Sequence, residues 1–485
     1  MVFFGANKSS WIYRFLNGSF WQSLGMICAK FLVLIVNFLL ANIMGGDGYG
    51  RLIFLQNTIN TSAAIASVGM NWATTKHVAE YKQNYGSLSG VISLSFLVVI
   101  LGGLFIGSLL IFFAPLISSQ LLSGSETALL RFAGSCVIFV VFTSIAFGVL
   151  SGLELFKLNA YLQVATSIIS ALLILISAYF FSLNITIYSM MIGFLITALI
   201  SAFIIYRISI GRFIFSIKKA LQHKEILYRY SLPAFISGSA ITLTLWYSQS
   251  MYIKNVDYLL FGVFAVANQF YLLIGSLNRI FGSVILPVYI STATTIGKSI
   301  SLEKFNLGFS WFASIIIAVV LILFSGVIAI VLGPDYQIEN WDAIMSVVLL
   351  SAVIFAFKQG AVRVILEKDL MWYGVLENLL SSVALIFCAY SFLPYGIIGL
   401  PVAILVSNIV SVIVIFTVLI IKGCLPEYFI KSKSVILVWL GVAGFFLMPL
   451  TNAAPLVIDA SSFLSVMLII FSGYVYWFRL SPVSN

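Results

Sequence analysis

The chain has 485 residues, of which 62% are apolar and only 8% are charged, and its net charge is +10. An ordinary soluble domain is about 45–50% apolar and about 25% charged, so this composition predicts a membrane protein with many spans. It excludes a soluble enzyme on a membrane anchor. It also excludes a β-barrel, whose strands alternate apolar and polar residues.

Apolar segments follow one another along almost the whole chain. At about 20 residues per span, they predict an all-α polytopic fold with about fourteen transmembrane helices. The predicted spans are 19–44, 49–73, 88–117, 127–152, 158–181, 184–206, 231–253, 259–288, 305–333, 342–365, 372–393, 396–421, 435–451 and 455–477. The first is too long for a cleavable signal and lacks a small-residue cleavage site, so we expect it to stay as a span.

The positive charges gather on one side of this topology. If the N-terminus is cytoplasmic, the cytoplasmic segments hold most of the 25 Lys and Arg residues, and the opposite loops are short and mainly acidic. This asymmetry follows the positive-inside rule and predicts that both termini are cytoplasmic. The longest loop, 207–230, is basic, and we expect it to lie on anionic lipid headgroups. Because the cations are spread over many loops, no nucleic-acid partner is expected.

Three dipeptides recur at nearly one offset. Tyr49-Gly50 opens the second span and Phe261-Gly262 the eighth, 212 residues later. The pairs Leu153-Glu154 with Leu366-Glu367, and Ala178-Tyr179 with Ala389-Tyr390, recur at offsets of 213 and 211. Each pair stands at the same place in a six-span unit, which predicts a parallel repeat with its axis along the membrane normal. Such repeats are typical of transporters that alternate access between their halves.

The repeat predicts four segments. Residues 1–206 form an N-terminal six-helix lobe, 207–230 a basic cytoplasmic linker, and 231–421 a C-terminal six-helix lobe. Residues 422–485 add two extra helices.

Lys30 lies deep in the first span. It is about 16 Å into that helix at 1.5 Å per residue, near the middle of a hydrocarbon core of about 30 Å. A charge at that depth is costly unless it faces water or a partner. Ser23, Lys30 and Asn37 repeat every seven residues and share one helical face. We expect this face to line an interior cavity; the alternative is a structural hydrogen bond to a neighbouring helix.

Other spans carry polar stripes at helical spacing, so further substrate-binding residues are predicted. They are Asn60 in the second span, Trp246 and Gln249 in the seventh, Tyr271 and Arg279 in the eighth, and Lys358 and Arg363 in the tenth. The alternative for each neutral residue is interhelical packing and hydrogen bonding. Gly103 and Gly107 form a GxxxG pair, which is most simply a packing notch.

The signs of these charges predict a cationic cavity. Asp342 and Asp459 lie at the outer ends of their predicted spans and are counted with the acidic outer loops, so Glu377, near the start of the eleventh span, is the only acidic residue that we place within a span. A cationic cavity suits an anionic substrate, because Arg binds phosphate in bidentate fashion and Lys acts as a point charge. Glu377 is predicted to couple transport to an ion, or else to pair with Lys368 or another cation.

Most enzyme chemistry has no residues to support it. The four cysteines and two histidines form no CxxC or Cys/His cluster, so no metal site and no cofactor are expected. No Gly-rich phosphate loop is present, and no outer loop is long enough for a catalytic domain. We expect a transporter and not an enzyme.

Several short motifs together resemble a known family. They are Asn42-Ile-Met-Gly-Gly-Asp-Gly-Tyr-Gly50, Gly69, Lys76-His-Val-Ala-Glu-Tyr81 and Leu232-Pro233. With them, residues 10–430 resemble the polysaccharide-repeat-unit flippases, the O-antigen (Wzx-type) translocases of the multidrug/oligosaccharidyl-lipid/polysaccharide exporter superfamily.

The resemblance implies a MATE-like fold in the bacterial inner membrane. It implies that undecaprenyl-pyrophosphate-linked oligosaccharide is flipped to the periplasmic leaflet, driven by a proton or sodium gradient or by membrane potential. Many relatives carry an acidic residue in the seventh span. Residues 246–250 here read Trp-Tyr-Ser-Gln-Ser, which leaves the coupling ion open.

Membrane lipids, an O-antigen polymerase and a chain-length regulator are the expected partners. On this reading, Ala in place of Lys30 or Lys358 should abolish translocation while membrane levels stay normal. The alternatives are a flippase for another envelope glycolipid, a small-molecule antiporter of the same fold, and a membrane enzyme of envelope polysaccharide assembly.

Overall fold

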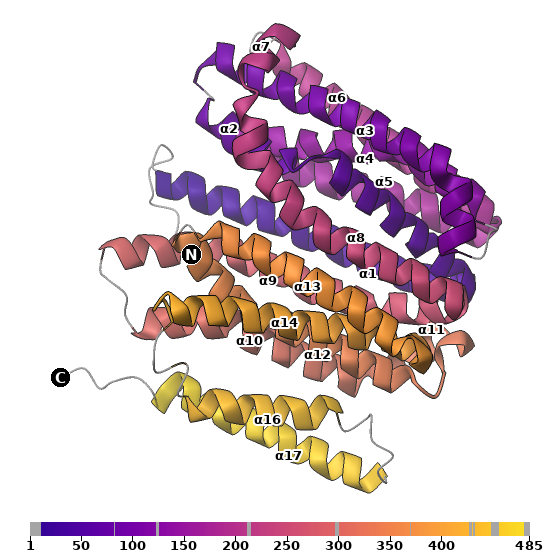
Figure 1. Cartoon of the computed structure of the whole chain (residues 1–485), viewed down its shortest axis with the longest axis vertical. Helices are drawn as coiled ribbons and strands as arrows, with labels where there is room; N and C mark the ends of the chain where they lie inside the picture. Colours follow the sequence, from indigo (N-terminus) through magenta and orange to yellow (C-terminus); the bar gives the residue numbers. More distant parts are fainter. Residues whose placement is uncertain are drawn as a thin grey trace. The chain divides into compact units, whose positions relative to one another are not determined.

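The structure is a computed structural model that describes residues 11–81, 83–122, 126–210, 215–295, 300–368, 370–425, 429, 432–447 and 455–479. Over these residues the chain is helical, with turns between the helices and no strand (Figure 1). It divides into two compact units, Met1–Gly262 and Val263–Asn485, called the N-unit and the C-unit below. The lobes predicted from the repeat divide earlier, at 207–230, and those boundaries stay a prediction.

The N-unit holds the elements up to the start of α9. They are α1 (Trp11–Ala66), α2 (Met70–Glu80), α3 (Tyr85–Leu121), α4 (Thr127–Gly152), α5 (Phe156–Phe180), α6 (Leu183–Ser209), α7 (Ile217–Gln222), a π-helical turn (Leu227–Ser231) and α8 (Leu232–Asn255). Helix α9 (Tyr258–Thr295) begins in the N-unit and continues in the C-unit.

The C-unit holds the remaining elements. They are α10 (Ile300–Leu323), α11 (Ser325–Leu332), a 3-10 turn (Pro334–Tyr336), α12 (Trp341–Glu367), α13 (Met371–Phe392), a 3-10 turn (Leu393–Ile398), α14 (Gly399–Ile421), α16 (Lys433–Leu447), α17 (Pro455–Tyr474) and a π-helical turn (Val475–Arg479).

Nine helical stretches in the described residues are long and apolar enough to cross a membrane. Two of them, Ser23–Ala66 and Met371–Ile421, have 44 and 51 residues, enough for two spans each at about 20 residues per span. Adding α8, α16 and α17 accounts for the predicted fourteen. The fold class predicted from composition and periodicity is therefore confirmed.

Helix α1 contains the first two predicted spans without a loop between them. Gly45 has φ 67° and ψ 178°, a backbone conformation that glycine adopts without steric cost, and it breaks the helix. The second span was predicted to continue to residue 73. It ends at Ala66, because Val68 and Gly69 both have positive φ, and α2 begins at Met70.

The N-unit is packed around α4. Val137, Val141, Ile145 and Val149 repeat every four residues and are all 0% exposed, which places one apolar face of α4 in the core. The predicted GxxxG notch is confirmed. A Cβ atom on Gly107 would lie 2.6 Å from the carbonyl oxygen of Gly134 on α4, so the two backbones touch there.

Corresponding helices pack alike in the two units. In the N-unit, α3 packs on α4, α4 on α6 and α5 on α6, as Figure 1 shows. In the C-unit, α10 packs on α12, α12 on α14 and α13 on α14. These pairs occupy equivalent places in the predicted six-span repeat, in which α16 and α17 are the two additional helices.

The basic linker is also part of the packed N-unit. Helix α7 lies against α3, Ala220 is fully buried, and the backbone N–H of Ser216 donates to Ser93 Oγ at 2.9 Å. The ring of His223 covers Gly90 of α3, where a Cβ would lie 2.5 Å from the ring. This part of the linker therefore packs against α3, and its contact with lipid headgroups stays a prediction.

A close backbone contact joins the bend of α1 to the start of α9. A Cβ atom on Gly50 would overlap the carbonyl oxygen of Tyr258, and one on Gly262 would overlap that of Gly46. We call these four residues the glycine contact.

Arg51 lies beside the glycine contact and links three segments of the N-unit. Its Nε donates to Asp47 at 2.9 Å and its Nη1 to Glu126 at 2.6 Å. Its guanidinium lies 4.5 Å from the centre of the Tyr258 ring. Because Glu126 is only 2% exposed, the Arg51–Glu126 pair is a partly buried tie between the bend of α1 and the start of α4.

Candidate functional site

A cavity of about 580 Å³ lies inside the N-unit, between both halves of α1 and helices α4, α5 and α6. We call it the N-unit cavity. Its polar lining residues are Lys30, Asn37, Gln56, Asn60, Thr143, Ser144, Thr166, Ser167, Ser170 and Thr197. The apolar part of its wall includes Leu52, Phe147 and Phe194.

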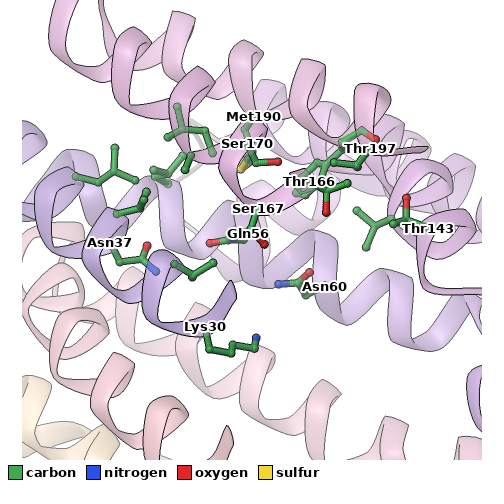
Figure 2. A pocket seen from close by; sticks show the side chains of 18 of the residues that line it. Lys30, Asn37, Gln56, Asn60, Thr143, Thr166, Ser167, Ser170, Met190 and Thr197 are labelled. Atoms are coloured by element: carbon green, nitrogen blue, oxygen red, sulfur yellow. The ribbon is translucent and has the colours of Figure 1, made fainter. Parts of the chain in front are cut away.

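The geometry of α1 places four of these polar residues together. Lys30 and Asn37 are seven residues apart and share a face before the break at Gly45. Gln56 and Asn60 are four residues apart and share a face after it. All four line the cavity, and Figure 2 shows their side chains opposite the hydroxyl groups of α5 and α6. The structure thus brings together two predicted site residues, Lys30 and Asn60.

The three threonine hydroxyl groups of the cavity donate to backbone carbonyls of their own helices. Thr143 donates to Phe139 O at 2.9 Å, Thr166 to Leu162 O at 2.7 Å, and Thr197 to Phe194 O at 2.8 Å. Each hydroxyl proton is thereby used, and the oxygen keeps lone pairs that can accept. The side-chain donors of the wall are the amides of Asn37, Gln56 and Asn60 and the ammonium of Lys30. Among the residues that the structure describes, no Asp or Glu lines the cavity.

Trp246 and Gln249 lie outside this cavity. The indole N–H of Trp246 donates to Thr58 Oγ1 at 2.8 Å, and Gln249 Oε1 accepts from Asn57 Nδ2 at 3.1 Å. Gln249 is only 2% exposed. Both side chains therefore hold α8 against the second half of α1, which is the interhelical alternative considered for them.

Lys358 and Glu377 are brought together in the C-unit. Lys358 Nζ donates to Glu377 Oε1 at 2.9 Å and to Ser411 Oγ at 2.5 Å, and Ser411 also bonds Glu377. The three residues come from α12, α13 and α14, and each is less than a tenth exposed. Of the roles considered for Glu377, the structure shows pairing, and its partner is Lys358. Lys368 instead lies 3.5 Å from Glu367.

Arg363 is also held within the C-unit. Its Nε donates to Asn306 Oδ1 at 2.7 Å and its Nη2 to the Asn306 carbonyl at 2.6 Å. Ser310 Oγ lies 3.3 Å from both terminal nitrogens. The side chain is 3% exposed, so it ties α12 to α10. Lys358 and Arg363 were expected to present their charges to a cationic cavity. Their contacts show both charges bonded to side chains of neighbouring helices instead.

The two remaining candidates lie on α9. The hydroxyl of Tyr271 accepts from Asn408 Nδ2 of α14 at 3.3 Å. Arg279 is exposed, and its Nη2 donates to Ser276 Oγ at 3.0 Å on the same helix. Arg279 thus differs from Arg363, whose guanidinium donates hydrogen bonds to another helix.

Sequence reasoning missed the half of the cavity wall formed by α4, α5 and α6. Ser167, Ser170 and Thr197 could not be recognised in the sequence as lining residues, because Ser and Thr are common wherever membrane helices pack closely. Asn37 stood on the predicted face of Lys30, and Gln56 lies one helical turn before Asn60. Their amides, in the middle of apolar segments, were the available signal.

Comparisons with known proteins agree with this architecture. The family model described as polysaccharide biosynthesis protein matches residues 15–293. A comparison with curated protein sequences gives no match.

Three solved structures have a similar fold. The lipid II flippase MurJ, in an inward closed conformation, has a TM-score of 0.67 at 19% identity, covering 95% of this chain and 99% of that one. An inward-facing multidrug resistance MATE family transporter of the MOP superfamily has a TM-score of 0.64 at 15% identity, covering 83% and 94%. A MOP superfamily transporter from Pyrococcus furiosus, described as having a binding pocket of reversed polarity, has a TM-score of 0.62 at 15% identity, covering 84% and 95%.

At these identities the structures show the fold alone, a MATE-like and MurJ-like helical fold. The family model covers more than half of the chain. The chain therefore belongs to the polysaccharide biosynthesis protein family.

Proposed function

We propose that this protein translocates undecaprenyl-pyrophosphate-linked oligosaccharides, specifically O-antigen repeat units, from the cytoplasmic to the periplasmic leaflet of a bacterial inner membrane. The family match on residues 15–293 supports a role in polysaccharide biosynthesis. The fold is similar to that of a lipid II flippase, a protein whose named substrate is also a lipid. Together they favour a lipid-linked saccharide as cargo.

The observation that carries this proposal is the N-unit cavity. Its wall places amides, hydroxyls and one cation, Lys30, among helices whose length and composition suit a membrane. Polar groups at such depth are costly unless they serve water or a ligand. A saccharide headgroup crossing the bilayer needs such a wall, since it cannot shed all its hydrogen bonds into hydrocarbon.

The driving force is proposed to be a proton or sodium gradient or the membrane potential. An inside-negative potential favours outward movement of an anion by about 2.3 kcal/mol per charge per 100 mV. Glu377 remains the proposed coupling residue. Because Lys358 Nζ contacts its carboxylate, an incoming proton or sodium ion would have to compete with that ammonium. Coupling through Glu377 then means that the Lys358–Glu377 pair opens during the cycle.

After translocation, the repeat unit is proposed to pass to an O-antigen polymerase and a chain-length regulator. Both termini of the chain are proposed to be cytoplasmic, with the basic linker on the same side. This orientation is supported by the positions of the cations along the sequence.

A deletion strain tests the proposal through its surface lipopolysaccharide ladder. Loss of an O-antigen flippase leaves repeat units on the inner leaflet and none on the surface, and the cloned gene restores the ladder. Loss of a polymerase leaves lipopolysaccharide capped with a single unit, which would favour an assembly enzyme. An unchanged ladder with loss of capsule or another envelope glycan would assign the protein to that glycolipid, and resistance changes alone would indicate an antiporter.

A further inference from the structure

The N-unit cavity has too little positive charge for a pyrophosphate. Within the described part of the chain, Lys30 is the one cation in its wall, and no Arg contributes to it. A pyrophosphate linkage carries more than one negative charge and is bound in proteins by Arg forks, several cations or backbone N–H groups at helix N-termini. Here the wall is formed by the sides of helices. The cavity therefore matches a ligand that is neutral or carries a single negative charge.

The hydrogen-bonding pattern of the wall matches sugar hydroxyl groups. Thr143, Thr166 and Thr197 offer acceptor oxygens, because their protons are already donated to backbone carbonyls. Gln56 and Asn60 offer amide donors as well as acceptors. A sugar hydroxyl donates one hydrogen bond and accepts others, so it can pair with both kinds of group.

The size and the apolar part of the wall also fit a sugar. At about 580 Å³, the cavity is within the usual range of about 300–1,000 Å³ for small-molecule sites. This volume has room for only a small part of a long oligosaccharide. Leu52, Phe147 and Phe194 give apolar surface against which the C–H face of a pyranose ring can pack.

A metal cation fits the same wall poorly. Hydroxyl and amide oxygens are good ligands for hard cations, but the described residues of the wall include no carboxylate to balance the charge. The ammonium of Lys30 adds repulsion. The wall thus offers neither the carboxylates that suit sodium nor the several cations that suit pyrophosphate.

We infer that the N-unit cavity is a subsite for a single sugar residue of the lipid-linked oligosaccharide, with Lys30 beside a hydroxyl or an acidic group of that sugar, and that the pyrophosphate is bound elsewhere. This inference rests on the proposed function. It makes the cavity a determinant of which saccharides are carried.

The test uses two lipids that differ only in the sugar. Full-length protein in nanodiscs is titrated with undecaprenyl pyrophosphate and with undecaprenyl pyrophosphate carrying one N-acetylhexosamine, and affinity is measured from ligand-induced thermal stabilisation. The variants are Thr197→Val and Gln56→Leu. The matched control is Thr186→Val, on the same helix α6. Its hydroxyl also donates to a backbone carbonyl, at 3.1 Å, but it is not among the residues that line the cavity.

The sugar-bearing lipid is expected to bind wild type and Thr186→Val more tightly than the bare lipid. Each cavity variant should lower affinity for the sugar-bearing lipid about 2- to 13-fold, the range for one hydrogen bond, and leave affinity for the bare lipid unchanged. Equal losses for both lipids would place the pyrophosphate in the cavity and overturn the inference. So would an unchanged preference for the sugar in both variants. Binding of neither lipid by wild type would instead refute the proposed function on which the inference depends.

Discussion

Removing one charge of the buried Lys358–Glu377 pair should destabilise the C-unit far more than removing both. Replacing Lys358 with Met keeps the length of the side chain but leaves the Glu377 carboxylate buried, with Ser411 as its remaining partner. Breaking a buried ion pair in this way typically costs about 3–5 kcal/mol. Replacing both members with neutral residues is often close to neutral. The double variant Lys358→Met/Glu377→Gln should therefore regain most of the lost stability, because the introduced amide oxygen can still accept from Ser411.

The matched control is Lys368→Met. Lys368 makes an ion pair with Glu367 at 3.5 Å, but its side chain is 43% exposed, so its loss should cost only about 0–1 kcal/mol. Each variant is solubilised in detergent and heated, and the folded fraction is followed by size-exclusion chromatography. Surface O-antigen is measured in parallel.

This expectation replaces the one drawn from sequence, that loss of Lys358 leaves membrane levels normal. If Lys358→Met is as stable as Lys368→Met, or if the double variant is no better than the single one, the reasoning from burial is wrong. A fully folded single variant without translocation would instead give Lys358 a direct role in transport, either in substrate binding or in coupling through Glu377.

Three further predictions concern the N-unit. Lys30→Ala should keep normal membrane levels, because the Lys30 side chain is exposed, but it should lose translocation. Lys30→Arg should keep part of the translocation activity. An intact O-antigen ladder in the Lys30→Ala strain would contradict this prediction. Gly50→Ala should lower thermal stability, because the new Cβ would overlap the carbonyl oxygen of Tyr258. The control Gly374→Ala should not, because the space at its Cβ is open. Equal melting temperatures for the two variants would count against the glycine contact. Burial, and secondarily the charge of His77, lowers the pKa of His223 in the folded protein. The neutral imidazole therefore stabilises the fold fully above the ordinary histidine pKa of about 6.5, and this stabilisation is lost as the pH falls below that value. A melting temperature that falls as steeply between pH 7.5 and 5.5 in His223→Gln as in wild type would refute that assignment.

The fold could be predicted from the sequence because a segment in a bilayer must satisfy its backbone hydrogen bonds internally, which an apolar helix does. The lengths of the apolar segments and the turn residues between them were enough to predict about fourteen helices. The breaks at Gly45 and Val68 changed only where these helices end. The sites were harder, because a charge within a span has the same sequence signature whether it faces a cavity or another side chain. Lys30 and Lys358 look alike in the sequence. They differ in the structure because a carboxylate 19 positions along the chain from Lys358 reaches its ammonium.

The hydroxyl half of the N-unit cavity could not be predicted for a related reason. Ser170 and Thr197 acquire their role only when α5 and α6 face the two halves of α1. This proximity arises from tertiary packing, so no periodic pattern in the sequence indicates it. The amides of Gln56 and Asn60 were detectable because a primary amide is costly in hydrocarbon, whereas a hydroxyl that bonds its own helix is not.

The glycine contact joins positions that are equivalent in the predicted repeat. Gly262 stands 212 positions after Gly50, and Tyr258 stands 212 positions after Gly46. The contact is reciprocal: Gly50 meets Tyr258, and Gly262 meets Gly46. A surface that touches its own copy in this crossed manner has the local symmetry of an isologous dimer. Each half of the contact therefore uses one glycine to let a carbonyl oxygen of the other segment approach. A substitution at one glycine disturbs only one half of the contact directly, so the two glycines can be exchanged one at a time to measure what each half contributes.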